Sequence, residues 1–122
     1  MFLEINFKKL IQSFKFAFCG IKTILEEEQI FKVMLLVSAL VIIVMFYLNL
    51  PLTQKVVLFT IIILVLMLEL VNSTIEKLLD FICPQTNGKV KKIKDTLAGI
   101  VLLASIGAAI IGILIFLPYI SK

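Results

Sequence analysis

The chain has 122 residues, of which 61% are hydrophobic and 16% are charged, and its formal net charge is +4. Its mean hydropathy of +1.17 lies far above the range of soluble globular domains. Apolar stretches fill most of the length, which excludes a separate soluble catalytic domain and predicts a single all-α membrane domain over residues 1–122.

Residues 1–27 predict an amphipathic helix that lies on the membrane surface. Apolar side chains recur every three or four positions, and lysine, glutamine and serine fall largely on the opposite side. A basic helix with an aromatic apolar face lies in the interface plane rather than crossing the bilayer. A cleavable signal would instead show a short continuous apolar core followed by a small-residue cleavage site.

Three further segments are long and apolar enough to cross about 30 Å of hydrocarbon. We predict spans over residues 33–50, 56–80 and 97–120, with a polar loop over 81–96. Lysines gather before the first span and around the loop, so the positive-inside rule puts the amino terminus and the loop in the cytoplasm.

The second span carries a polar stripe formed by Glu69, Asn72, Glu76 and Asp80. At 100° per residue, Glu76 and Asp80 lie about 20° on either side of Glu69. Asn72 lies about 60° away, so all four residues share one face. Ionisable groups at membrane depth are costly and usually functional. The alternative interpretation is a structural polar face that packs one helix against another.

Acidic residues at the cytoplasmic ends of the spans suggest metal and phosphate chemistry. Glu28 precedes the first span and Glu76 lies near the same end of the second. Two carboxylates with open water positions suit Mg²⁺, which usually retains substrate phosphates. Lys94 and Asp95 add a cation for phosphate and another acid, although Lys94 could be a solvated juxtamembrane charge. Glu69 lies deeper, within reach of a lipid hydroxyl as a general base.

The chain contains no histidine, no glycine-rich nucleotide motif and no cysteine pair with metal-site spacing. No nucleic-acid partner is expected. The residues alone therefore predict a membrane enzyme or transporter whose cytoplasmic face can hold magnesium.

The string Glu69-Leu-Val-Asn72-Ser-Thr-Ile-Glu76-Lys-Leu-Leu-Asp80 resembles the signature of the small prokaryotic diacylglycerol kinase and undecaprenol kinase family. The resemblance also covers the segments 13–22, 94–99 and 115–118 together with Glu28, and so reaches nearly the whole chain. It implies a homotrimer in the bacterial inner membrane, with a surface helix, three membrane spans and active sites between subunits near the cytoplasmic surface.

The resemblance also assigns roles to individual residues. Glu69 is expected to take the proton of the lipid hydroxyl with help from Asn72, and Glu28 and Glu76 are expected to hold Mg²⁺. The residues expected to bind ATP are Lys9, Phe16, Glu28, Glu76, Asp80, Gln85, Asn87, Lys94 and Asp95. The residues expected at the lipid are Lys9, Ser13, Phe14, Lys15, Phe18, Glu69 and Gly99.

The implied reaction transfers the γ-phosphoryl group of ATP to a lipid hydroxyl. Met34 stands where diacylglycerol-type members have an acid, and the segments 13–15 and 116–118 resemble the Gram-positive branch, whose members tend to phosphorylate undecaprenol. Diacylglycerol is the alternative acceptor. Residues 85–87 depart from the common Glu-Tyr-His of the family, and Lys9 replaces an arginine of some members, which loses bidentate phosphate geometry.

Two alternatives belong to other functional classes. Glu69 could serve as the coupling carboxylate of a small oligomeric proton-coupled transporter. The small residues in the segment 107–112 could instead pack helices together in a non-catalytic membrane adaptor.

Overall fold

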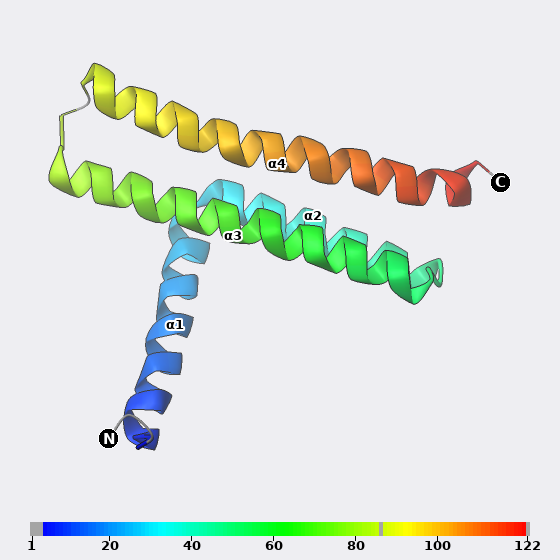
Figure 1. Ribbon diagram of the computed structural model, residues 1–122, viewed down its shortest axis with the longest axis horizontal. Coiled ribbons are helices and arrows are strands. Elements are labelled where there is room, and N and C mark those ends of the chain that lie inside the picture. The colour runs from blue at the N-terminus through cyan, green and yellow to red at the C-terminus, as the bar shows by residue number, and fades with distance from the viewer. Residues whose placement is uncertain (1–3, 86, 122) are drawn as a thin grey trace.

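The protein is described by a computed structural model over residues 4–85 and 87–121, and those residues form four helices. These are α1 (Phe7–Glu27), α2 (Gln29–Tyr47), α3 (Leu52–Ile82) and α4 (Gly88–Ile120). Helices α2, α3 and α4 run side by side, whereas α1 leaves them at a steep angle (Figure 1). Each of α2, α3 and α4 is long and apolar enough to cross a membrane. The predicted all-α class, with an amino-terminal helix before three apolar helices, is confirmed.

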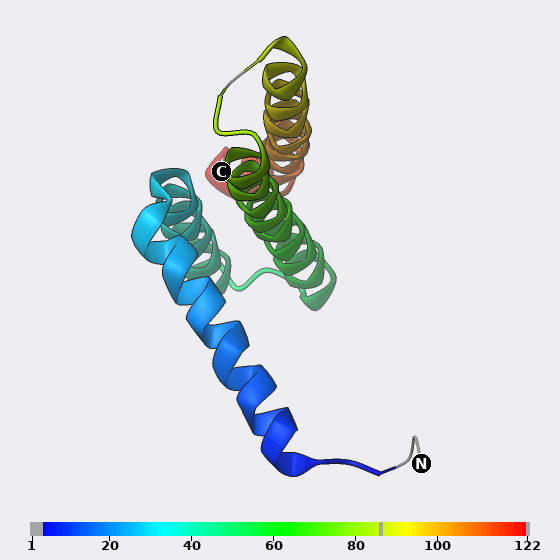
Figure 2. The same cartoon turned by 90° about the vertical axis from the view of Figure 1, so that its left-hand side faces the viewer.

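Helix α1 has well-defined ends and a fully exposed apolar face. Asn6 caps its start, because the Asn6 side chain accepts a hydrogen bond from the backbone N–H of Lys9. One extended residue, Glu28, separates α1 from α2 and turns the chain. Phe7, Phe14 and the other large side chains of the apolar face are exposed, and α1 runs away from the other helices (Figure 2). This face suits a helix that lies on a membrane surface.

The best-packed part of the molecule lies where α2 turns into α3. Met45, Leu50 and Leu58 are buried together, and half-buried side chains near the end of α4 cover them. Asn49 takes a left-handed conformation with φ of 53°, which asparagine tolerates better than most residues. The apolar core therefore lies at the opposite end of α3 from the polar stripe.

The segment 81–96, expected as a loop, is mostly helical. Helix α3 continues to Ile82 and α4 begins at Gly88, so the connection consists of residues 83–87. Asn87 fixes the start of α4, because its Oδ1 accepts the backbone N–H of Val90 at 2.9 Å. The first turns of α4 are rich in lysine and are helical, because lysine is a good helix former. Their polarity marks a membrane boundary and not the end of the helix. The first apolar helix likewise begins earlier than the predicted 33–50 and ends earlier, at Tyr47.

Helix α3 lies between α2 and α4 and contacts both of them. An apolar groove of about 580 Å³ runs along these helices, with Val37 of α2, Ile62 of α3 and Gly112 of α4 among its lining residues. At 100° per residue, the lining residue Ile62 lies about 20° from Glu69 around α3. The groove therefore follows the same face of α3 as the buried acid.

Candidate active site

Three polar side chains are buried in the carboxyl-terminal half of α3. Glu69 is 3% exposed, Asn72 is 8% exposed and Ser73 is 1% exposed. Burying a carboxylate costs free energy unless hydrogen bonds or opposite charges compensate for the lost water. The burial of these three side chains marks the centre of the candidate site.

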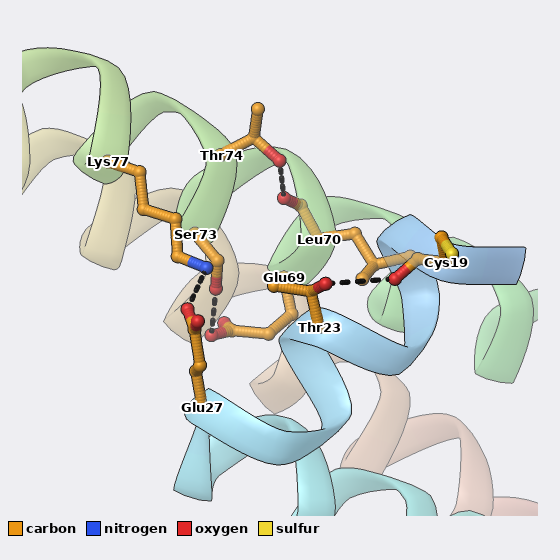
Figure 3. Close-up of polar contacts among 8 residues, drawn as sticks. All are labelled: Cys19, Thr23, Glu27, Glu69, Leu70, Ser73, Thr74 and Lys77. Carbon is orange, nitrogen blue, oxygen red and sulfur yellow. Dashed lines mark hydrogen bonds and ion pairs between the residues drawn. The ribbon is translucent and has the colours of Figure 1, made fainter. Parts of the chain in front are cut away.

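The Glu69 carboxylate has two polar neighbours on its own helix. The Ser73 hydroxyl donates to Oε1 of Glu69 at 3.4 Å (Figure 3). Asn72 lies three residues beyond Glu69, on a neighbouring part of the same helix face. The Oδ1 atom of Asn72 is buried and has no hydrogen-bond partner among the described residues. Leaving a buried acceptor unsatisfied costs about 1–3 kcal/mol, so this atom is suited to a donor that comes from outside the described chain.

The end of α1 is tied to α3 beside the buried acid. Glu27 at the end of α1 forms an ion pair with Lys77 of α3, and Figure 3 shows the two side chains pointing toward each other. The adjacent Glu28 is half-buried. Glu28 directly follows Glu27 and Glu76 directly precedes Lys77, so the ion pair brings the α1–α2 junction to the turn of α3 that carries Glu76. The fold therefore gathers the three predicted acids, one from the α1–α2 junction and two from α3.

The start of α4 is tied to the end of α3 by a second ion pair. The Lys94 amine lies 2.5 Å from Oδ1 of Asp80, and Lys91 pairs with Asp95 at 3.0 Å. Of the predicted nucleotide residues, Lys94 and Asp80 therefore contact each other directly. They lie toward the end of the bundle where α3 and α4 are connected (Figure 1).

The structure does not bring the remaining predicted site residues to this cluster within one chain. Six of them lie on the part of α1 that stands away from the other helices, namely Lys9, Ser13, Phe14, Lys15, Phe16 and Phe18. Gln85 and Asn87 lie in the exposed α3–α4 connection, and Thr86 lies outside the described residues. Gly99 is exposed on α4. A single chain therefore contains the acidic centre of the predicted site, but its own α1 does not bring the predicted α1 residues to that centre.

The acidic centre fits magnesium chemistry only in a two-carboxylate form. Within residues 4–85 and 87–121, no group of three or more histidine, cysteine or acidic side chains could hold a metal ion. Glu28 and Glu76 offer hard carboxylate oxygens. Magnesium is commonly bound by one or two protein carboxylates, with water and substrate phosphates filling its other positions. The donor set therefore fits Mg²⁺ that arrives with a nucleotide.

Sequence reasoning missed the role of Ser73 and the pairing of Glu27 with Lys77. Ser73 is four residues beyond Glu69 and therefore lies on a neighbouring part of the same helix face, which was a readable signal. The Glu27–Lys77 pair joins residues 50 positions apart and depends on the direction in which α1 leaves the bundle. No pattern in the sequence determines that direction.

Comparison with known proteins assigns this arrangement to a family. The sequence matches the family described as prokaryotic diacylglycerol kinase over residues 15–116. A protein of Synechocystis sp. named diacylglycerol kinase is 34% identical over 110 residues, which cover 89% of this chain and 63% of that relative. The chain thus spans less than two thirds of the relative's length. The matched region includes Glu28, the whole polar stripe and Lys94–Asp95, and the chain belongs to the prokaryotic diacylglycerol kinase family.

Proposed function

We propose that the protein is an ATP-dependent lipid kinase that transfers the γ-phosphoryl group of ATP to the hydroxyl of a membrane lipid, with undecaprenol as the preferred acceptor. The observation that carries this proposal is the buried Glu69 on α3, on the same helix as Glu76 and tied through the Glu27–Lys77 pair to the junction that carries Glu28. Membership of the diacylglycerol kinase family supports the same reaction class.

In this mechanism, Glu69 acts as the general base for the acceptor alcohol. The lipid oxygen attacks the γ-phosphorus while its proton passes to the Glu69 carboxylate. The bond from the γ-phosphorus to the bridging oxygen breaks, and its electron pair leaves with ADP. Phosphoryl transfer of this kind depends mainly on positioning and charge neutralisation. Asn72 lies beside Glu69 and helps to orient the carboxylate and the phosphoryl group.

The nucleotide end of the site is formed by acids and a lysine. Glu28 and Glu76 would hold Mg²⁺, which when bound neutralises phosphate charge. Lys94 would contact the phosphates, and its pair with Asp80 holds the amine at the end of α3. Asp95 borders the same region. Lys9, Phe16, Gln85 and Asn87 complete the proposed nucleotide contacts.

The apolar groove supports a lipid acceptor. Its residues share a face of α3 with Glu69, so a lipid whose hydroxyl reaches the carboxylate can keep its chain among apolar side chains. Met34 is one of the lining residues, and its apolar side chain suits an isoprenoid chain. Ser13, Phe14, Lys15, Phe18 and Gly99 are proposed at the headgroup level. Diacylglycerol is the second candidate, because the Synechocystis relative is named diacylglycerol kinase.

We further propose that the working enzyme is a homotrimer in the bacterial inner membrane, with its amino terminus in the cytoplasm. Two observations support an oligomer. The α1 residues that are expected to contact ATP and lipid lie on a helix that runs away from the rest of its own chain (Figure 2). The apolar faces of all the helices are also largely exposed. A neighbouring copy can supply α1 to the site and cover part of those faces.

Phosphoryl transfer from radiolabelled ATP tests the proposal. Purified protein in detergent micelles with Mg²⁺ receives undecaprenol and diacylglycerol in parallel, and labelled lipid is measured. We expect label in both lipids, a higher kcat/KM for undecaprenol, and no label after magnesium is chelated. Absence of label in both lipids would end the kinase proposal and favour the proton-coupled transporter. A higher kcat/KM for diacylglycerol would reverse the acceptor assignment alone.

A further inference from the structure

Most serine and threonine hydroxyls in these helices form the same local hydrogen bond. Each of six residues donates to the backbone carbonyl four positions earlier, at distances of 2.7–3.0 Å, namely Ser13, Thr23, Ser38, Thr60, Thr74 and Thr96. This local bond is the usual way for a helix to satisfy a hydroxyl that would otherwise face an apolar environment. It requires no other side chain.

Ser73 does not form this local bond to a backbone carbonyl. Its hydroxyl donates to the Glu69 side chain rather than to a backbone carbonyl. Thr74, the next residue, bonds to the Leu70 carbonyl at 2.7 Å and is exposed, and Figure 3 shows both arrangements together. Ser73 is 1% exposed, so its hydroxyl is enclosed with the carboxylate. The comparison with Thr74 shows that the local bond is available on this part of α3 and is not used by Ser73.

We propose that Ser73 is a positioning residue for phosphoryl transfer, which holds Oε1 of Glu69 and leaves Oε2 to accept the proton of the lipid hydroxyl. The inference rests on the proposed role of Glu69 as the base. A carboxylate has a soft terminal torsion, so a donor on one oxygen restricts the direction of the other. Ser73 itself touches neither the lipid nor the nucleotide in this account.

Loss of the hydroxyl should affect turnover rather than binding. In Ser73→Ala the carboxylate samples orientations in which Oε2 does not face the acceptor, and misplacement of a reacting group lowers the rate of the chemical step. We expect kcat to fall about tenfold while KM for ATP and KM for lipid stay unchanged. Ser73→Thr keeps the donor and should restore most of the lost kcat. Thr74→Ala should leave kcat unchanged, because Thr74 bonds only to the backbone.

The experiment measures kcat and both KM values for the wild type and these three variants in detergent micelles, together with thermal unfolding. Ser73→Ala is also combined with Glu69→Asp. If Ser73 acts through Glu69, the serine change should cause no further loss in the Glu69→Asp background. Wild-type kcat in Ser73→Ala, a rise in KM alone, or additive losses in the double variant would each overturn the inference.

An infrared measurement keeps the test independent of turnover. The carboxylate stretching band of Glu69 is identified by its loss in Glu69→Gln, and we expect it to shift in Ser73→Ala and stay in place in Thr74→Ala. An unshifted band would contradict the proposed hydrogen bond even if the kinase assay failed. Lipid labelling by the wild type with an unaffected Ser73→Ala variant would remove the positioning role and leave the proposed function intact.

Discussion

At the residue scale, the buried polar residues on α3 include a hydrogen-bond acceptor that the described residues of one chain leave unsatisfied. Asn72 Oδ1 is buried without a hydrogen-bond partner among the described residues, and Glu69 lies in a largely apolar helix. Groups of this kind lower stability unless they are satisfied. Their presence on the same helix as Glu76 supports the proposal that they belong to the active site.

Asn72→Leu should therefore separate stability from activity. Leucine has a similar size and removes the unsatisfied acceptor, so we expect the free energy of unfolding to stay equal or rise by about 1 kcal/mol. Phosphoryl transfer should fall at least about tenfold, because the carboxylate loses an orienting neighbour. Thermal unfolding in micelles and the lipid-labelling assay measure the two quantities. A less stable protein with full activity would show that Asn72 serves structure.

At the element scale, an ion pair ties the carboxyl-terminal end of α1 to α3. The Glu27–Lys77 pair lies next to Glu28, and both of its side chains are partly exposed. Partly exposed pairs contribute about 0.2–1 kcal/mol, so this one can bias the position of α1 without fixing it rigidly. The placement of Glu28 depends on that position.

Loss of this pair should lower activity moderately. We expect Lys77→Met and Glu27→Gln each to reduce lipid labelling about two- to fivefold, in keeping with the modest strength of such pairs. The charge-swapped double variant, Glu27→Lys with Lys77→Glu, should recover part of the loss. The matched control is Glu26→Gln, because Glu26 pairs only loosely with Lys22 at 4.0 Å and both side chains are exposed. Equal losses in Glu26→Gln would attribute the effect to the general charge of α1.

The elements also show which features sequence reasoning can reach. Hydropathy located all three apolar helices, because burial in lipid imposes length and composition directly. It missed the helical turns from Gly88 onward, because polarity marks where hydrocarbon ends and not where hydrogen bonding ends. The helical period put Glu69, Asn72 and Glu76 on one face. The approach of Glu28 to that face depends on its own extended conformation between α1 and α2, which no periodic pattern encodes.

At the scale of the whole molecule, a single chain has little interior. Its compact apolar core is the Met45, Leu50 and Leu58 cluster at the α2–α3 turn, while most large apolar side chains face outward. Such surfaces need lipid or other copies of the chain to cover them. The outward course of α1 makes the second possibility specific, because the amino-terminal half of α1, which contains the predicted residue Lys9, runs away from the other helices of the same chain (Figure 2).

Mixing two inactive variants tests whether copies share a site. Glu69→Gln chains and Lys9→Met chains should each have low activity alone. If a site takes α1 from one copy and α3 from another, co-reconstituted chains should regain measurable labelling, since some sites receive two intact contributions. Native mass spectrometry should show three chains in each assembly. Mixed assemblies that stay as inactive as the separate variants would place each site within one chain.

The most direct test of the account is lipid labelling by Glu69→Gln, measured beside nucleotide binding. The substitution keeps the size of the side chain and removes the proton acceptor, so we predict loss of phosphoryl transfer with retained binding of ATP and Mg²⁺. Glu26→Gln, on the exposed surface of α1, should transfer phosphate at the wild-type rate. Transfer by Glu69→Gln at a rate close to that of Glu26→Gln would contradict the role of Glu69 as the base.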